Sequence, residues 1–222
     1  MSAEQIPLPL LEPRIAYGRA DFLIAPCNAE AVAMVDRWPA WPGGSLLVSG
    51  PAGSGKSHLG EVWRARSGAL LATPETLAPE TVPQLLAAGA LILDRADEVR
   101  DEAALFHLLN YAREASVPLL LLARSLPEDW VLTRPDLLAR LKALARVAVA
   151  PPDETLLSAL LVKLLSDRQI GPVPREVVAY IVERMERSYA AAERVVDALD
   201  RESLGRKKGV NLAVAKAALA SL

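Results

Sequence analysis

One octapeptide, residues 50–57, constrains this chain more than any other feature of its sequence. It consists of Gly50, Pro51, Ala52, Gly53, Ser54, Gly55, Lys56 and Ser57, and it fits the pattern G-x-x-x-x-G-K-[ST]. Glycines in such a loop let backbone N–H groups approach a polyphosphate, while the lysine reaches the terminal phosphates and the hydroxyl binds Mg²⁺. The apolar run before the loop and the helical stretch after it predict a strand, a phosphate-binding loop and a helix.

Short apolar runs alternate with amphipathic segments from about residue 15 to residue 152. The predicted strands are 45–49, 69–72, 90–94, 118–123 and 146–150, with helices such as 56–66 and 101–115 between them. Apolar runs separated by amphipathic helices predict a parallel sheet that is covered on both faces. We therefore expect an α/β fold built on a five-stranded parallel sheet.

The pattern changes after the segment 151–153, which reads Pro-Pro-Asp. The remaining segments with helical periodicity are 154–168, 175–185, 188–204 and 211–221, and Asp153 and Asn211 stand where N-caps are favoured. The layout resembles the core and helical lid of AAA+ proteins. We predict an extended tail over 1–14, a nucleotide-binding core over 15–152 and an all-helical lid over 153–222.

A second half of the site follows from the strand 90–94, which is four apolar residues ending in Asp94. A carboxylate at the end of a buried strand beside the phosphate loop can hold Mg²⁺ through water. Asp94 is therefore predicted to bind magnesium with Ser57 and to be a catalytic residue. The next residue is Arg95, where strong AAA+ ATPases have an acidic residue that positions the attacking water. We expect ADP or ATP to bind with Mg²⁺ and intrinsic hydrolysis to be weak.

The overall charge and hydropathy argue against two classes of function. The net charge is −2 at pH 7, which is not typical of a dedicated nucleic-acid binder. The longest apolar run, 117–123, is too short to cross a membrane. The single cysteine, Cys27, suits a reducing compartment. We expect a soluble cytoplasmic protein without a membrane partner, in which the basic residues 206–208 make at most a weak or indirect contact with DNA.

Several segments together resemble the DnaA branch of the AAA+ proteins. They are 55–59 (Gly-Lys-Ser-His-Leu), 21–24 with Asn28, 135–141 and 151–153. The resemblance implies that Phe22, Leu23 and Asn28 lie on the adenine side of the nucleotide. His58 is a candidate for contact with phosphate, and a purely structural histidine is the alternative.

The segment 135–141 resembles the arginine-finger box of that branch. The resemblance implies that Arg140 reaches a nucleotide held by a neighbouring subunit, where such an arginine accelerates hydrolysis by roughly 10³–10⁵. The neighbouring subunit that holds this nucleotide could be a second copy of the chain, in a homo-oligomer, or a different protein. The alternative interpretation of Arg140 is a solvated arginine on an amphipathic helix.

Residues 5–10 resemble the hexapeptide by which the Hda family of DnaA-related proteins docks on the DNA polymerase sliding clamp. The predicted clamp-binding residues are Gln5, Ile6, Leu8, Pro9 and Leu10. Apolar side chains of an extended, proline-stiffened peptide can fill pockets, while a glutamine amide supplies directional hydrogen bonds. Because no DNA-binding domain follows the helical segments, we expect a regulator. The resemblance implies that it stimulates ATP hydrolysis by the initiator DnaA and so negatively regulates replication initiation.

Two positions depart from the family pattern, and two other functions remain open. The lid arginine of the family falls at Ala190, with Arg187 and Arg194 nearby, and the nearest hydroxyl after the strand 118–123 is Ser125. A self-sufficient AAA+ ATPase would hydrolyse ATP alone, and Arg95 counts against it. An adaptor would tether the initiator without changing its hydrolysis, and the intact segment 135–141 counts against that.

Overall fold

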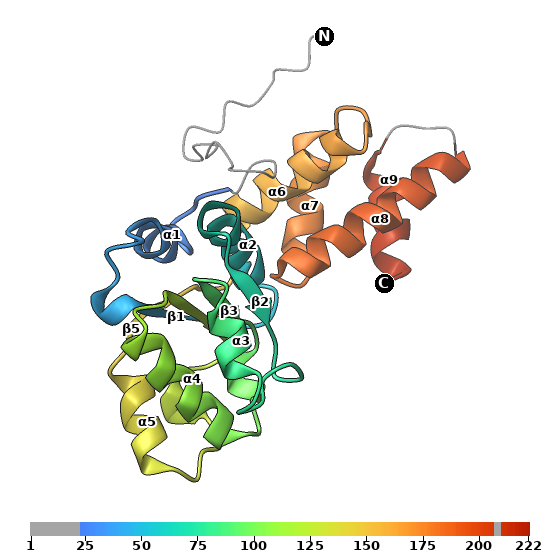
Figure 1. Cartoon of the computed structure of the whole chain (residues 1–222). Helices are drawn as coiled ribbons and strands as arrows, with labels where there is room; N and C mark the ends of the chain where they lie inside the picture. The colour runs from blue at the N-terminus through green and yellow to red at the C-terminus, as the bar shows by residue number, and fades with distance from the viewer. Residues whose placement is uncertain (1–22, 207–209) are drawn as a thin grey trace. The chain divides into compact units, whose positions relative to one another are not determined.

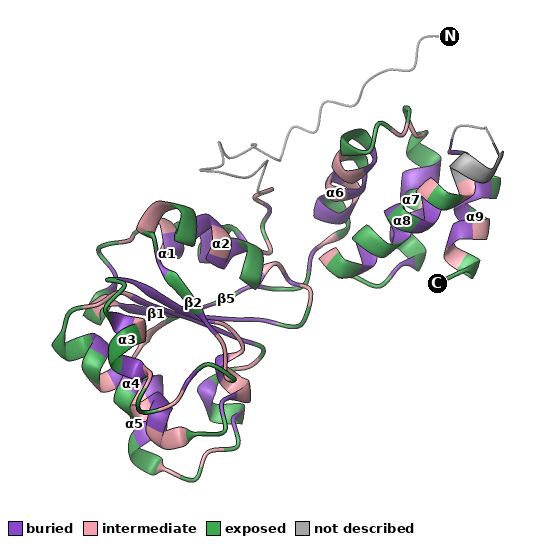
Figure 2. Ribbon diagram, turned by 45° about the vertical axis from the view of Figure 1, so that its right-hand side comes forward, coloured by how far each residue is buried: buried purple, intermediate pink, exposed green. Residues whose placement is uncertain are grey.

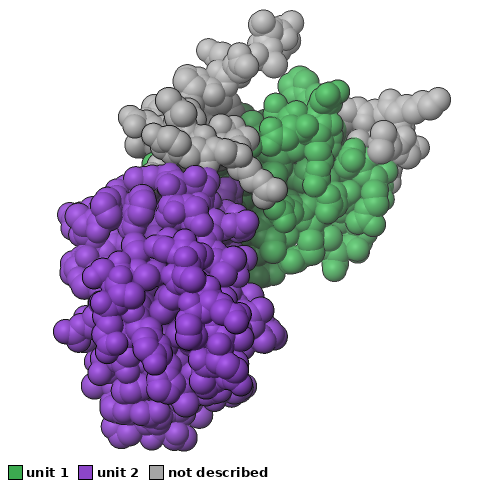
Figure 3. All heavy atoms as spheres, viewed as in Figure 1, with its two compact units in different colours: residues 1–14, 23–27, 151–222 green, residues 15–22, 28–150 purple. Residues whose placement is uncertain are grey.

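The structure is a computed structural model that describes residues 23–206 and 210–222. The chain divides into two compact units, which Figure 3 colours separately. Residues Asn28–Ala150 belong to one, called the sheet unit here, while Leu23–Cys27 and Pro151–Leu222 belong to the other, called the helical unit. The proposed domain boundaries at residues 15, 152 and 153 stay predictions.

The sheet unit contains the five-stranded, all-parallel sheet that the apolar runs predict (Figure 1). Its strands are β1 (Ser45–Ser49), β2 (Leu70–Ala72), β3 (Leu91–Leu93), β4 (Leu119–Ala123) and β5 (Ala145–Ala148), in the order β2-β3-β4-β1-β5. Ser49 is level with Ala123 of β4 and Ala148 of β5. The carboxyl ends of the three strands therefore meet at one edge, which is where the phosphate loop begins.

The last strand differs from the prediction of 146–150. It starts one residue earlier and ends at Ala148, although the Val149 N–H still donates to the Ser49 carbonyl at 2.7 Å. The neighbouring strand β1 has ended at Ser49, so the chain beyond Val149 has no ladder to continue.

Helices cover both faces of the sheet, with α1 and α2 on one face and α3, α4 and α5 on the other (Figure 2). Their bounds are Ala29–Asp36, Lys56–Ser67, Val82–Leu86, Glu102–Glu114 and Pro135–Lys142. The predicted helices 56–66 and 101–115 are confirmed to within one residue at each end. Helix α3 has only five residues, too few to show a helical period in the sequence.

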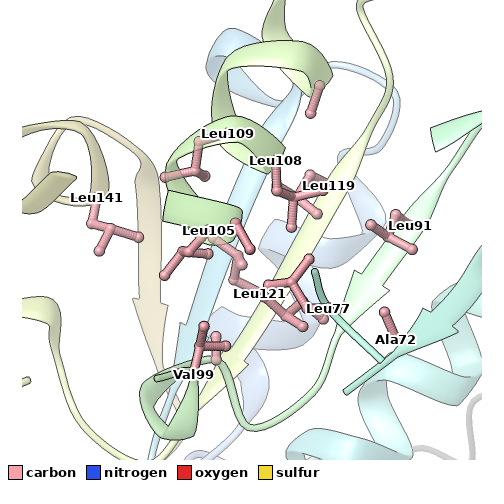
Figure 4. Packing of buried hydrophobic residues seen from close by; sticks show 14 of the residues in the cluster. Ala72, Leu77, Leu91, Val99, Leu105, Leu108, Leu109, Leu119, Leu121 and Leu141 are labelled. Carbon is pink, nitrogen blue, oxygen red and sulfur yellow. The ribbon is translucent and has the colours of Figure 1, made fainter. Parts of the chain in front are cut away.

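Strands β3 and β4 consist of apolar residues alone because both of their faces are buried. Leu119 and Leu121 of β4 pack against Leu105 and Leu108 of α4 (Figure 4), and all four are almost fully buried. Leu122 contacts the opposite helix: a Cβ placed on Gly60 of α2 would lie only 2.9 Å from its Cδ1 atom. Helix α2 is thus held close against the sheet.

Helix α2 is also fixed by the packing of an aromatic side chain. Trp63 is fully buried, and its ring centroid lies 5.0 Å from that of Trp41 and 6.0 Å from that of Trp38. Aromatic pairs at such distances add to the free energy gained from burial alone. The helix that follows the phosphate loop therefore has a rigid support.

The helical unit has its own apolar core, which includes Leu157, Leu161, Ile181 and Leu199. Its helices are α6 (Glu154–Asp167), α7 (Arg175–Arg184), α8 (Tyr189–Arg206) and α9 (Leu212–Ala220). They confirm the four predicted segments to within two residues at each end. Both predicted N-caps are confirmed: the Asp153 carboxylate accepts from the Leu156 N–H, and the Asn211 amide oxygen accepts from two N–H groups of α9. Within 23–206 and 210–222, no helix combines the length and the apolar character needed to span a membrane.

Candidate functional site

The loop 50–55 leaves the buried strand β1 and leads directly into α2. Gly50 lies so close to the residue that follows β5 that a Cβ on Gly50 would be 2.3 Å from the Val149 carbonyl oxygen. Gly55 has a φ of 91°, a left-handed conformation that L side chains rarely adopt. The glycines at these two positions are therefore required by close approach and by backbone conformation, as the motif predicts.

Lys56 begins α2, and its side chain folds back over the loop. The Lys56 ammonium donates to the carbonyls of Gly50 at 2.6 Å and Pro51 at 2.8 Å, and to the Ser54 hydroxyl at 3.4 Å. Burial lowers the pKa of Lys56 below its ordinary value, and the charges of Asp94 and Asp97 partly oppose that shift. A buried ammonium held only by neutral groups is well suited to bind an anion.

Ser57 and Asp94 come together at the end of β3. The Ser57 hydroxyl donates to Asp94 Oδ2 at 3.1 Å. Mg²⁺ takes oxygen ligands, commonly a hydroxyl and one or two carboxylates completed by phosphate and water. The donor set therefore fits a magnesium ion bound together with a nucleotide, in agreement with the residue types that the sequence offers there.

The loop after Asp94 is closed by ion pairs of Arg95. The Arg95 guanidinium lies 2.6 Å from Glu75 and 3.1 Å from Glu98, and its backbone has a φ of 55°. Its hydrogen bond with Glu75 holds the pKa of that exposed carboxyl down at about 2. The residue after Asp94 is thus an arginine whose charge is neutralised by ion pairs, and not a carboxylate. The sequence alone did not identify Glu75 as a partner of Arg95.

The end of β4 is joined to the same loop through Arg124. The Arg124 N–H donates to Asp97 at 3.1 Å, and its guanidinium lies 3.3 Å from Glu98. Ser125, the hydroxyl suggested by the sequence, uses its backbone carbonyl to accept from the Trp130 indole at 3.1 Å. Sequence reasoning did not single out Arg124 as a residue of this site. Its position directly after the buried strand β4 is the signal that could have identified it.

A cleft of ≈ 1030 Å³ borders this site and is lined by residues of α2 and of strands β2, β3 and β4. Its polar lining includes Ser57, the exposed His58 and Asp94, and its apolar lining includes Ile92 and Leu122. No residue of 50–56 lines it, although all of them are described. The cleft therefore adjoins Ser57 and Asp94 but is not the volume that would hold a polyphosphate against the loop.

Arg140 lies on α5, in the same unit as the phosphate loop but on the other face of the sheet (Figure 2). Its Cζ atom is 4.9 Å from the centroid of the Phe106 ring, and that of Arg134 is 4.4 Å from the same centroid. Arg134 is paired with Asp136 at 2.7 Å. Within the described residues Arg140 makes no ion pair, so of these two arginines it is the one whose charge is not compensated. Sequence reasoning missed Phe106, because no motif links Arg140 to an aromatic residue on a different helix far upstream in the chain.

The residues predicted to contact adenine fall in both units. Leu23 belongs to the helical unit, and Asn28 is buried in the sheet unit, where its carbonyl accepts from the Val32 N–H at 3.0 Å. Phe22 lies outside the described residues. So do all five predicted clamp-binding residues, Gln5, Ile6, Leu8, Pro9 and Leu10.

The arginines considered for the lid position are engaged within the helical unit. Arg187 lies 2.6 Å from Glu154 and Arg194 lies 3.1 Å from Glu186, while Ala190 is exposed on α8. Both ion pairs are exposed and so contribute little to stability. Little free energy is therefore lost when either arginine leaves its carboxylate to bind another anion.

Comparison with known proteins rests on structure. No family model matches the sequence, and no curated protein matches it. Domain III of the replication initiation protein DnaA from Thermotoga maritima has a TM-score of 0.75 at 18% identity, covering 95% of this chain and 98% of that one. AMPPCP-bound DnaA from Aquifex aeolicus has a TM-score of 0.68 at 16% identity, covering 84% and 67%.

A third similar structure is the FIGL-1 AAA domain in complex with ADP. Its TM-score is 0.68 at 14% identity, with 94% of this chain and 84% of that chain covered. Identities this low establish the architecture and leave the activity to be argued from the chain's own residues. Together with the all-parallel five-stranded sheet and the phosphate loop, these likenesses show that the chain has the α/β fold of the AAA+ proteins.

Proposed function

We propose that this protein binds ADP or ATP with Mg²⁺ at residues 50–57 and uses Arg140 to stimulate ATP hydrolysis by a partner, the initiator DnaA. In this proposal it docks on the DNA polymerase sliding clamp through residues 5–10 and limits replication initiation in the cytoplasm. One contrast carries the proposal: Arg95 and its ion pairs occupy the position where a hydrolysing site needs a carboxylate, whereas Arg140 makes no ion pair among the described residues.

The nucleotide-binding part rests on Lys56, Ser57 and Asp94. The Lys56 ammonium would exchange the Gly50 and Pro51 carbonyls for phosphate oxygens, and Ser57 and Asp94 would hold the metal. A bound Mg²⁺ would supply neutralisation of the phosphate charge. The likeness in fold to an AMPPCP-bound DnaA and to an ADP-bound AAA domain adds support.

Replacing the loop lysine tests this part. We expect Lys56→Ala to weaken the binding of a fluorescent ADP analogue by about 10- to 100-fold, because charged hydrogen bonds contribute about 1.5–3 kcal/mol. Lys142→Ala, which removes an exposed lysine at the end of α5, is the matched control and should bind normally. Equal affinity of the two variants would contradict the assignment.

The hydrolysis-stimulating part rests on the charge of Arg140. A guanidinium beside the γ-phosphate in the partner's site stabilises the negative charge that develops in the transition state. Arg134 is a close control, because it lies over the same ring but is paired with Asp136. We expect Arg140→Ala to abolish the stimulation of initiator ATP hydrolysis and Arg134→Ala to retain most of it.

The clamp-binding part is tested separately. Combined Gln5→Ala and Leu8→Ala substitution should abolish capture of the protein by immobilised clamp, and unchanged capture would refute this part. Steady ATP turnover by the isolated protein would instead favour a self-sufficient ATPase. Clamp-dependent capture of the initiator without faster hydrolysis would favour an adaptor.

A further inference from the structure

Phe106 of α4 lies against two arginines, one directly before α5 and one within it. Its ring carries the guanidinium of Arg134 at 4.4 Å and that of Arg140 at 4.9 Å, measured from Cζ to the ring centroid. The ring is half-buried and packs against the core of the sheet unit. The ring is therefore a packed surface against which both guanidinium groups lie.

The segment that carries the two arginines is itself fixed to α4. The Glu102 carboxylate accepts from the Thr133 N–H at 2.7 Å, from the Thr133 hydroxyl at 2.9 Å and from the Arg134 N–H at 2.9 Å. These bonds, led by that of the Thr133 N–H, lower the pKa of Glu102, so it stays charged at neutral pH. Glu102 and Phe106 are one helical turn apart, and together they fix the start of α5 relative to α4.

The two arginines differ in how their charge is compensated. Arg134 forms two hydrogen bonds with Asp136, at 3.2 and 2.7 Å, and that pairing raises its pKa. Arg140 makes no ion pair with a described carboxylate, and its guanidinium lies over the ring face of Phe106. The Phe106 ring thus orients Arg134, which is paired with a carboxylate, and Arg140, whose guanidinium can still bind an anion.

We propose that Phe106 is a positioning residue that holds the Arg140 guanidinium ready for a phosphate in a partner's site. This inference rests on the proposed function. An aromatic face attracts a cation through its quadrupole and leaves the guanidinium charged, with its N–H donors free to bind the incoming phosphate. A carboxylate in the same place would compete with the phosphate for those donors and would neutralise the charge.

The test uses variants that separate the ring from its bulk. Phe106→Tyr keeps an aromatic face, whereas Phe106→Leu and Phe106→Met keep apolar packing without one. The assay measures stimulated ATP hydrolysis with the full-length protein. We expect the Leu and Met variants to lower the maximal rate by about two- to fivefold. A partly exposed cation–π contact can change the fraction of protein with Arg140 in position by about this factor. The concentration for half-maximal stimulation should stay within twofold, and Phe106→Tyr should keep the wild-type rate.

A purely structural role or a docking role for Phe106 predicts other results. Loss of rate in Phe106→Tyr equal to that in Phe106→Leu, a wild-type rate in both apolar variants, or a change confined to half-saturation would each overturn the proposal. If Arg140→Ala keeps full stimulation, the proposed function itself fails. If Arg140→Ala loses stimulation while the apolar variants do not, only the role of Phe106 fails.

A direct observation on the wild-type protein is independent of how well any Phe106 variant folds. Protons of the Arg140 side chain, assigned by comparison with Arg140→Lys, should show an upfield ring-current shift in the NMR spectrum, since they lie over the Phe106 face. Shifts equal to those of a solvated arginine would overturn the proposal.

Discussion

At the scale of single residues, the phosphate loop depends on a buried ammonium without a bonded counter-ion. Lys56 is only 8% exposed and is held by two carbonyls and one hydroxyl. Burial lowers the pKa of Lys56, and a phosphate bound there would raise it again. A bound phosphate would therefore offset the free-energy cost of burying the charged Lys56 ammonium.

Gly50 gives the sharpest test of the loop's conformation. Gly50→Ala would place a Cβ 2.3 Å from the Val149 carbonyl oxygen, so the segment that follows β5 or the phosphate loop must move. We expect the free energy of unfolding to fall by about 1–3 kcal/mol, a typical cost of forcing extra atoms into a packed site, with loss of ADP binding. Gly171→Ala, where an added Cβ meets nothing within 4 Å, is the control for chemical denaturation. A Gly50→Ala protein as stable as that control would contradict the geometry.

The Glu75–Arg95 pair predicts a pH dependence. The pKa of Glu75 is lowered from 4.5 to about 2, chiefly by the hydrogen bond from Arg95. A lowered folded-state pKa means that the contact stabilises the protein fully above pH 4.5 and is lost as the pH falls through about 2. A carbon-13 NMR titration can follow the Glu75 carboxyl in the wild-type protein and in the Arg95→Ala variant. At a pH where Glu75 has begun to protonate in the variant, Glu75 of the wild-type protein should remain ionised. The same midpoint in both proteins would rule out the pairing.

At the scale of the element, the sequence predicts strands and long helices well for physical reasons. Strands buried on both faces read as continuous apolar runs, and long helices such as α4 show a full amphipathic period. The end of β5 was predicted two residues too late, because it is set by where β1 stops pairing and not by local hydropathy. The pairing of Ser57 with Asp94 could be anticipated from two motifs at the ends of parallel strands.

Other contacts at the site depend on tertiary packing that carries no local signal. Arg95 finds Glu75 twenty residues upstream, and Arg140 rests on Phe106 of a different helix. Neither pairing follows from spacing along the chain. The residue types were visible in the sequence, but their partners are decided by how β2, β3, α4 and α5 are arranged.

The N-cap of α9 provides a test at this scale. The Asn211 side-chain oxygen accepts from the Ala213 N–H at 3.0 Å and the Val214 N–H at 3.1 Å. We expect Asn211→Ala to lower the free energy of unfolding by about 1 kcal/mol, measured by urea denaturation. Asn211→Ser keeps an acceptor and should lose much less. Equal losses in the two variants would show that the cap contributes little.

At the scale of the whole molecule, the sheet unit carries two distinct sets of groups. The phosphate loop, Ser57 and Asp94 stand at the carboxyl ends of β1 and β3, whereas Arg140 lies on α5, on the opposite face of the sheet from α2 (Figure 2). We propose that the first set binds the protein's own nucleotide and that the second acts on a nucleotide bound elsewhere. The AAA+ fold shared with DnaA domain III is compatible with such a division.

The most direct test of this account follows the hydrolysis of ATP that is already bound to the initiator. DnaA loaded with labelled ATP is mixed with DNA-loaded clamp and either wild-type protein or Arg140→Ala, each holding unlabelled ADP, and phosphate release is followed in a single turnover. We expect wild-type protein to accelerate release by roughly 10³-fold or more at saturation, the range for arginine fingers, and Arg140→Ala to leave the rate of DnaA alone. Equal acceleration by both proteins, or none by the wild type, would contradict the central claim.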